Sequence, residues 1–148
     1  MTQHTIASLA EKMRHIDFAM LSTHTRDGHI GARPMSNNHD VAHGGDSFYF
    51  TTEGTLMVQD IEHDPRVSLS FHGKSGLFNQ RPLFIALEGR ADLIRDKSRF
   101  EAHWNPDLEL WFEDGIDTPG LVMIHVHAER AHYWDGQDEG ELEIDALH

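Results

Sequence analysis

The spacing of apolar residues changes along the chain, and the change predicts a helix followed by a β-rich body. Apolar residues at positions 6, 9, 10, 13 and 16 follow helical spacing, and Thr5 before them is a suitable N-cap, so the chain is predicted to begin with an amphipathic helix. Residues 66–72 read RVSLSFH, in which apolar residues alternate with serine and histidine. This alternation is typical of a strand with one buried face.

Five further segments with strand-like composition complete the predicted sheet: 18–25, 29–37, 46–52, 83–95 and 121–134. The first two flank Asp27-Gly28, and Asp-Gly between apolar runs is a strong hairpin signal. Gly89 marks a predicted bulge or bend in the long fifth strand. Six strands in 148 residues predict a single domain, 1–148, built as a closed or partly closed antiparallel β-barrel.

Short helices and irregular stretches connect the predicted strands. Residues 56–63 form a helical segment that ends at Asp64-Pro65, and Asp96 is predicted to cap a short helix that runs through Trp104. Residues 105–120 are expected to be irregular or briefly helical, and residues 73–82 form a loop. The chain contains no internal repeat or linker that indicates a second domain.

The charge balance limits the kinds of partner that the protein can have. Twelve basic and 25 acidic side chains give a net charge of −13, which repels nucleic acids and anionic membranes and favours a small molecule or a protein as partner. Much of the excess lies in residues 135–148, which contain acidic residues and no lysine or arginine. This segment is predicted to be a solvated, loosely ordered tail.

Several classes of site and location are excluded or disfavoured by what the chain lacks. Without cysteine there is no disulfide framework, thiolate nucleophile or cysteine-ligated zinc site. Glu11, Lys12 and Arg14 interrupt the apolar residues at the start, and no segment is apolar over the length of a bilayer, so a cytoplasmic protein is predicted. There is no GxSxG elbow and no GxGxxG fingerprint, which argues against a hydrolase and a Rossmann site.

Histidine is abundant, with thirteen residues, and His125 and His127 lie on one face of a predicted strand. A metal site would need further ligands, and no aspartate or glutamate stands beside them at ligand-like spacing. We therefore predict no metal site.

The stretch FYFTTEGT, residues 48–55, predicts a different kind of site. Thr51, Thr52 and Thr55 place hydroxyl groups next to Gly54 and the start of the helical segment at residue 56. The first N–H groups of a helix have no intrahelical partner, and the helix dipole favours negative charge there, so this stretch can bind an anion. The alternative is a strand, a turn and an N-cap at Thr55 with no ligand.

The order of these elements resembles that of a known family. An initial helix is followed by FAMLSTHTRDGHIGARPMS, FYFTTEGT, a helix ending in HDPRVSLSF, ALEGRADLI and AERAHYWDG. This order, from Ile6 to Gly136, resembles the FMN-binding split barrels of the pyridoxamine 5′-phosphate oxidase superfamily, and most of all its general stress protein 26 branch. The resemblance implies a six-stranded antiparallel split β-barrel with flanking helices, which forms a homodimer and binds flavin.

The resemblance also assigns residues to the flavin site. It implies that Arg33 is directed toward the flavin, that the strand after it touches the ring, that the threonines hold the phosphate, and that an aromatic residue reaches the flavin across the dimer interface. The residues at these positions are Arg33, Pro34, Met35, Ser36, Phe50, Thr51, Thr52, Thr55, Leu56 and Trp134. No side chain stands out as a catalytic acid or base.

One departure from the family bears on function. Oxidases of the superfamily place Arg-Lys where this chain has Leu56-Met57, so two charge-assisted contacts to the phosphate are missing. Arg33, Lys74 or the hydroxyl and N–H groups would have to compensate, or the site takes another flavin such as FAD. The resemblance therefore implies a flavin-binding general stress protein, with a flavin-dependent oxidoreductase acting on an unknown small molecule as the alternative. Pyridoxamine 5′-phosphate oxidase activity is not expected.

Overall fold

The computed structural model describes residues 4–37, 39–75 and 81–144, and within them the protein is mainly β. Two α-helices flank the sheet, α1 (Ile6–Met13) and α2 (Leu56–His63). The strands are β1 (Phe18–His24), β2 (Ile30–Ser36), β3 (Ser47–Thr52), β4 (Arg66–Ser75), β5 (Arg81–Ile94), β6 (Leu121–Asp135) and β7 (Asp138–Glu143). Four 3-10 helices lie between β5 and β6: η1 (Lys97–Arg99), η2 (Glu101–His103), η3 (Pro106–Leu110) and η4 (Gly115–Asp117).

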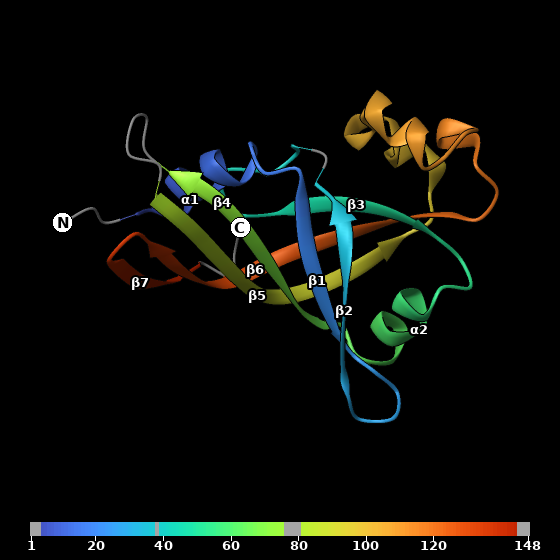
Figure 1. The fold of residues 1–148 in the computed structure, drawn as a ribbon. Coiled ribbons are helices and arrows are strands. Elements are labelled where there is room, and N and C mark those ends of the chain that lie inside the picture. The colour runs from blue at the N-terminus through green and yellow to red at the C-terminus, as the bar shows by residue number, and fades with distance from the viewer. Residues whose placement is uncertain (1–3, 38, 76–80, 145–148) are drawn as a thin grey trace.

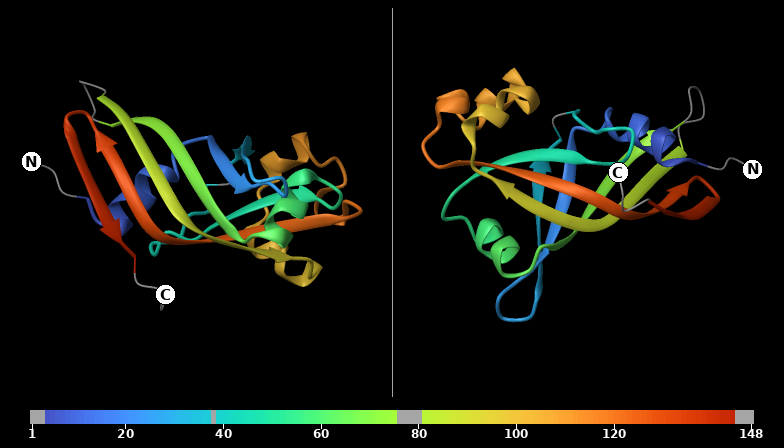
Figure 2. Two further views of the ribbon diagram at one scale, coloured as in Figure 1. Left: turned by 90° about the horizontal axis from the view of Figure 1, so that it is seen from below. Right: turned by 180° about the vertical axis from the view of Figure 1, so that it is seen from behind.

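The strands form one antiparallel sheet whose order explains its open, curled shape. The order is β2-β1-β4-β5-β6-β3, with β7 added beside β6. Figures 1 and 2 show the sheet curling, with the 3-10 helices gathered at one end and β7 at the other. The strands β2 and β3 stand at the two ends of this path, so the barrel is split between them. The predicted antiparallel split barrel is confirmed.

Local sequence signals account for most of the element boundaries. Thr5 caps α1, accepting a hydrogen bond from the Ser8 N–H at 3.1 Å, as its position before the apolar periodicity predicts. Gly28 adopts a φ of +89° in the turn between β1 and β2, a conformation that glycine reaches without steric cost. The bulge predicted near Gly89 is confirmed by a register shift between Glu88 and Gly89 against β6.

The same glycine allows β5 and β6 to approach closely. A Cβ atom on Gly89 would lie 1.9 Å from the carbonyl oxygen of His127, which no packing rearrangement of a side chain can relieve. Glycine is therefore required here by contact with the neighbouring strand.

Two clusters of buried side chains hold the fold together. The larger fills the inside of the curled sheet and includes Leu21, Leu69, Phe71 and Ile124, with α1 contributing Leu9, Ala10 and Met13. The smaller lies under the 3-10 helices and contains Phe50, Ile94, Phe100, Leu108, Leu121 and Met123. Burial raises the pKa of Tyr49 in the larger cluster.

The predicted loosely ordered tail is wrong for residues 138–143, which form β7. Three features of the fold order this segment. Leu142 packs against the main core, and Ile144 is buried in it. His132 on β6 lies 2.7 Å from Glu139 and 3.5 Å from Glu141, so the acidic side chains meet a basic partner across the sheet. Residues 145–148 of the predicted tail lie outside the described residues.

The loop predicted at 73–82 is shorter than expected. Strand β4 continues to Ser75 and β5 begins at Arg81, and residues 76–80 lie outside the described residues. Within the part of the chain that the structure describes, no helix combines the length and the apolar content needed to span a membrane.

Candidate functional site

A pocket of about 680 Å³ opens at the split between β2 and β3. Its walls come from β2, the end of β3, the start of α2 and the segment around η3. Eight of the ten residues predicted for the flavin site line it: Arg33, Pro34, Met35, Ser36, Phe50, Thr51, Thr55 and Leu56. Segments that are separated in the sequence thus share one cavity because the sheet brings its two end strands together.

The pocket is mainly apolar and has a few polar groups. Aromatic and aliphatic side chains dominate: Phe18, Met35, Phe50, Leu56, Met57, Leu108, Trp111 and Phe112. Ser36, Thr51 and Thr55 supply hydroxyl groups, and Arg33 is the only ionisable residue among the described residues of the lining. An apolar cavity of this size with a small number of polar groups is typical of a site for a cofactor or another small molecule.

The polar part of the pocket lining includes the start of α2. Thr55 is the N-cap, and its hydroxyl oxygen accepts a hydrogen bond from the Val58 N–H at 3.3 Å. The strand, turn and N-cap that were expected as the alternative are therefore present. In an α-helix the N–H groups of the first residues, here Leu56 and Met57, have no intrahelical acceptor, so they remain suited to an anion at the pocket wall.

Leu56 and Met57 occupy the positions of the basic pair in the oxidases, and their environments differ sharply. Leu56 is 73% exposed, whereas Met57 is 6% exposed and belongs to the main core. In the single chain, a basic side chain at position 56 would lie beside the pocket in contact with water. A lysine at position 57 would have to be buried among apolar side chains, which is costly for a charge.

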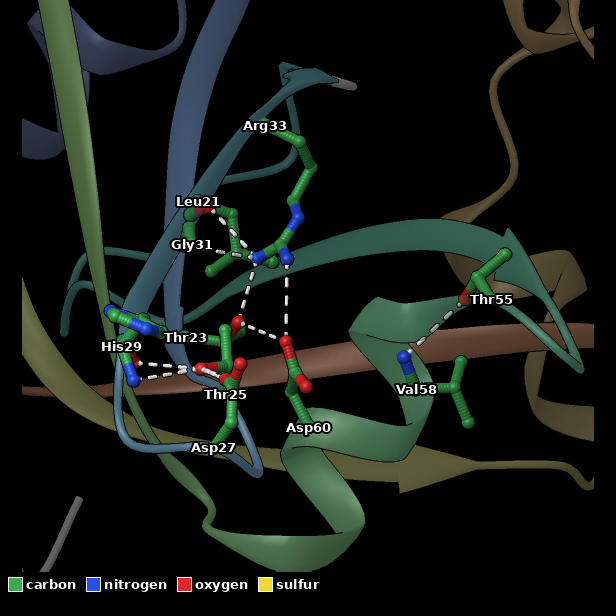
Figure 3. A network of polar contacts seen from close by, with 10 residues as sticks. All are labelled: Leu21, Thr23, Thr25, Asp27, His29, Gly31, Arg33, Thr55, Val58 and Asp60. Carbon is green, nitrogen blue, oxygen red and sulfur yellow. Dashed lines mark hydrogen bonds and ion pairs between the residues drawn. The ribbon is translucent and has the colours of Figure 1, made fainter.

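Arg33 does line the pocket, but its charge is already paired. One guanidinium nitrogen donates to the Thr23 hydroxyl at 2.8 Å and to the Leu21 carbonyl at 3.2 Å, and the other lies 3.5 Å from a carboxylate oxygen of Asp60 (Figure 3). Asp60 is only 4% exposed and also accepts a hydrogen bond from Thr23 at 2.8 Å. The pair brings little net positive charge to the pocket.

Asp60 is a residue of this site that the sequence interpretation missed. A usable signal exists, because Asp60 lies three residues after Met57 and directly before Ile61, on the face of α2 that is buried. An acidic residue on the apolar face of a short helix indicates a buried partner. The aromatic residues Trp111 and Phe112 were also missed, since residues 105–120 carry no regular pattern.

Three residues considered for the site lie elsewhere in this chain. Thr52 ends β3 but does not line the pocket. Trp134 lies near the end of β6, opposite Phe84, and its ring stacks on that of His132 with 4.0 Å between the ring centroids. Trp134 is 36% exposed, and its predicted place at a dimer interface stays a prediction. Lys74 was considered as a compensating charge, but it is part of β4, opposite Pro82, and does not line the pocket.

Solved structures share this fold over nearly the whole chain. A protein related to general stress protein 26, of the pyridoxinephosphate oxidase family, from Clostridium acetobutylicum superimposes with a TM-score of 0.79 at 19% identity, covering 97% of this chain and 96% of that one. General stress protein 26 of Bacillus anthracis gives 0.70 at 19% identity, with 94% and 96% covered. A heme-binding protein of Mycobacterium smegmatis gives 0.71 at 17% identity, covering 97% of this chain and 60% of that one.

Comparison at the level of sequence adds the family. No curated protein matches the chain. The family described as pyridoxamine 5′-phosphate oxidase like matches residues 4–144, which include the pocket, both α-helices and all seven described strands. The protein therefore belongs to the pyridoxamine 5′-phosphate oxidase-like family.

Proposed function

We propose that this protein binds FMN in the pocket between β2 and β3 and acts as a flavin-binding general stress protein. The observation that carries the proposal is the convergence of eight residues, chosen from the sequence by family resemblance, on one apolar cavity of about 680 Å³. The similarity to two proteins related to general stress protein 26 supports the stress-response part. We also propose the cytoplasm as its location.

The lining residues suit the two chemically different parts of the cofactor. Pro34, Met35 and Phe50 offer apolar surface to the ring system, while Thr51 and the N–H groups at the start of α2 offer donors to the phosphate. When bound, the flavin would supply hydride or electron transfer, and the protein would supply position, hydrogen bonds and exclusion of water.

The charge of the site favours modest affinity for the phosphate and argues against oxidase activity. Asp60 offsets the charge of Arg33, and Leu56 and Met57 add none, so hydroxyl and N–H groups must hold the anion. Weak binding of the phosphate also leaves FAD as an alternative cofactor, because selectivity for FMN depends on contacts with its terminal phosphate. A flavin-dependent oxidoreductase acting on an unknown small molecule is the alternative function.

The exposed apolar side chains around the pocket support a homodimer. Phe18, Leu56 and Trp111 line the cavity and are all largely exposed in the single chain, although each is a large apolar residue. Such a patch is typical of a protein interface. A second copy of the chain would cover it and would place its own Trp134 near the flavin, as the family resemblance implies.

Haem is a second cofactor that the comparisons bring into consideration, because one protein of similar fold binds it. Haem iron is usually held by histidine, cysteine, methionine or tyrosine. No histidine is found among the described residues that line the pocket, and the methionines there, Met35 and Met57, are mostly buried in the protein. Flavin is therefore the better-supported cofactor.

The visible absorption spectrum of the purified protein, before and after addition of FMN, FAD or haemin, tests the proposal. We expect the two visible flavin bands and quenching of flavin fluorescence with FMN. Replacing Phe50 with alanine should weaken this binding, whereas replacing Ile30, an exposed apolar residue that does not line the pocket, should not. A Soret band with haemin and no change with either flavin would overturn the proposal.

A further inference from the structure

A second cluster of polar side chains lies on the outer face of the sheet, away from the flavin pocket. Asp46 immediately precedes β3, and His125 and His127 lie on the neighbouring strand β6. None of the three lines the pocket. Phe50, the nearest residue of β3 that lines the pocket, is four positions after Asp46, which corresponds to about 13 Å along an extended strand.

The sheet register brings these three residues together. Phe48 pairs with His125 and Ser47 with Val126, so the next position back along β3 places Asp46 beside His127. His125 and His127 are two residues apart on one strand and therefore project from the same face. The turn before β3 also holds Asp46 in place, since the Ala42 N–H donates to the Asp46 carbonyl at 2.8 Å.

The distances from Asp46 to the two histidines match those between neighbouring ligands of one metal ion. One carboxylate oxygen of Asp46 lies 3.1 Å from Nε2 of His125 and 3.4 Å from Nδ1 of His127, and all three atoms lie within 4.8 Å of one another. Ligands that bind zinc at about 2.0–2.2 Å are separated by roughly 3–3.6 Å in tetrahedral or octahedral geometry. Small adjustments of the side chains would therefore admit an ion between them.

Both histidines contact neighbouring side chains that fix their rings, as is usual for histidines that bind a metal. Nε2 of His127 lies 3.0 Å from a carboxylate oxygen of Asp92, which leaves Nδ1 to face Asp46. A carboxylate that accepts the second N–H of a ligating histidine fixes the ring and raises its basicity. Phe48 stacks on the ring of His125 at a centroid distance of 4.4 Å, and its other stacking partner is His103 at 3.6 Å, so this ring is also fixed.

We propose that Asp46, His125 and His127 form a binding site for a first-row divalent transition metal ion, with Zn²⁺ as the representative ion. Two imidazoles and one carboxylate form a ligand set that binds zinc and iron in preference to calcium and magnesium. All three side chains are partly exposed, which leaves a coordination position for water or another ligand. The ion would join the start of β3 to β6 and so stabilise the strand whose far end forms the pocket wall.

The site was not predicted because its carboxylates are remote in sequence. Asp46 is 79 residues from His125, and Asp92 is 35 residues from His127. Only the pairing of β3, β5 and β6 brings these carboxylates to the histidines, so no spacing along the sequence indicates them.

Zinc binding by the full-length protein, stripped of metal with a chelator and kept free of flavin, tests the proposal. Titration in competition with a chromophoric chelator at neutral pH should show one saturable ion per chain. We expect Asp46→Asn to weaken binding at least 10-fold, His127→Gln about 100-fold, and Asp92→Asn about 10- to 100-fold through the orientation of His127. Zn²⁺ should also raise the thermal unfolding midpoint of the wild type and not that of His127→Gln.

His132→Gln is the matched control, because His132 lies on the same strand and also contacts two carboxylates, Glu139 and Glu141. It should leave the single strong site unchanged, and circular dichroism without metal would confirm that each variant is folded. The proposal is overturned if the wild type shows no saturable binding, or if Asp46→Asn and His127→Gln bind zinc as tightly as the wild type. The latter result would assign the ion to another of the thirteen histidines. Neither outcome bears on flavin binding.

Discussion

The buried pair between Arg33 and Asp60 is expected to matter for stability as well as for the pocket. At a separation of 3.5 Å the Coulomb attraction is about 4–5 kcal/mol for an effective dielectric constant near 20. Desolvation opposes this attraction, and a quarter of the Arg33 side chain is exposed, so the net coupling should be smaller, about 1–2 kcal/mol.

Arg33→Ala and Asp60→Asn, alone and together, measure this coupling in the absence of flavin. Arg33→Ala removes the guanidinium and leaves the Asp60 carboxylate with the hydrogen bond from the Thr23 hydroxyl (Figure 3). An uncompensated buried charge is costly, so the free energy of unfolding should fall by about 2–3 kcal/mol. Asp60→Asn keeps the shape of the side chain and should cost about 1–2 kcal/mol.

Urea unfolding of the four proteins gives the result directly. We expect the double variant to be less destabilised than the sum of the single variants by about 1–2 kcal/mol. Arg66→Ala is the control, because Arg66 pairs with Asp64 at 2.7 Å while largely exposed to solvent, and its loss should lower the free energy of unfolding much less than the loss of Arg33. Additivity of Arg33→Ala and Asp60→Asn within about 0.5 kcal/mol would refute the pairing argument.

Three further predictions concern the pocket, the core and the assembly. Leu56→Lys should raise FMN affinity by about 0.5–1 kcal/mol, more at low than at high salt, without creating pyridoxine 5′-phosphate oxidation. Fluorescence quenching measures the affinity, and an unchanged value would remove position 56 from the phosphate site. Tyr49→Phe should raise the free energy of unfolding by about 1 kcal/mol, because the buried hydroxyl makes no hydrogen bond of good geometry with a described residue. A lower free energy of unfolding in urea would contradict this. Light scattering at micromolar concentration should show a dimer, and a monomer would count against the proposed interface.

Patterns within short stretches of sequence were enough to predict most elements of this fold. The helical spacing after Thr5, the alternation in residues 66–72, the Asp27-Gly28 turn and the bulge at Gly89 all depend on neighbours along the chain, and the structure contains each of them. The residues of the pocket lining could be chosen because the order of the elements resembled a family, and eight of ten converge on one cavity.

Only the tertiary structure decided which distant side chains meet. The curl of the sheet brings β2 and β3 together at the split, and the packing of α2 against the sheet gives Arg33 its partner 27 residues away, Asp60. The pairing of β7 with β6 orders acidic residues that composition alone describes as a tail, and the pairing of β3 with β6 places Asp46 beside His125 and His127. These contacts depend on strand order and register, which are set by the burial of the whole core and leave no signal in any single stretch of sequence.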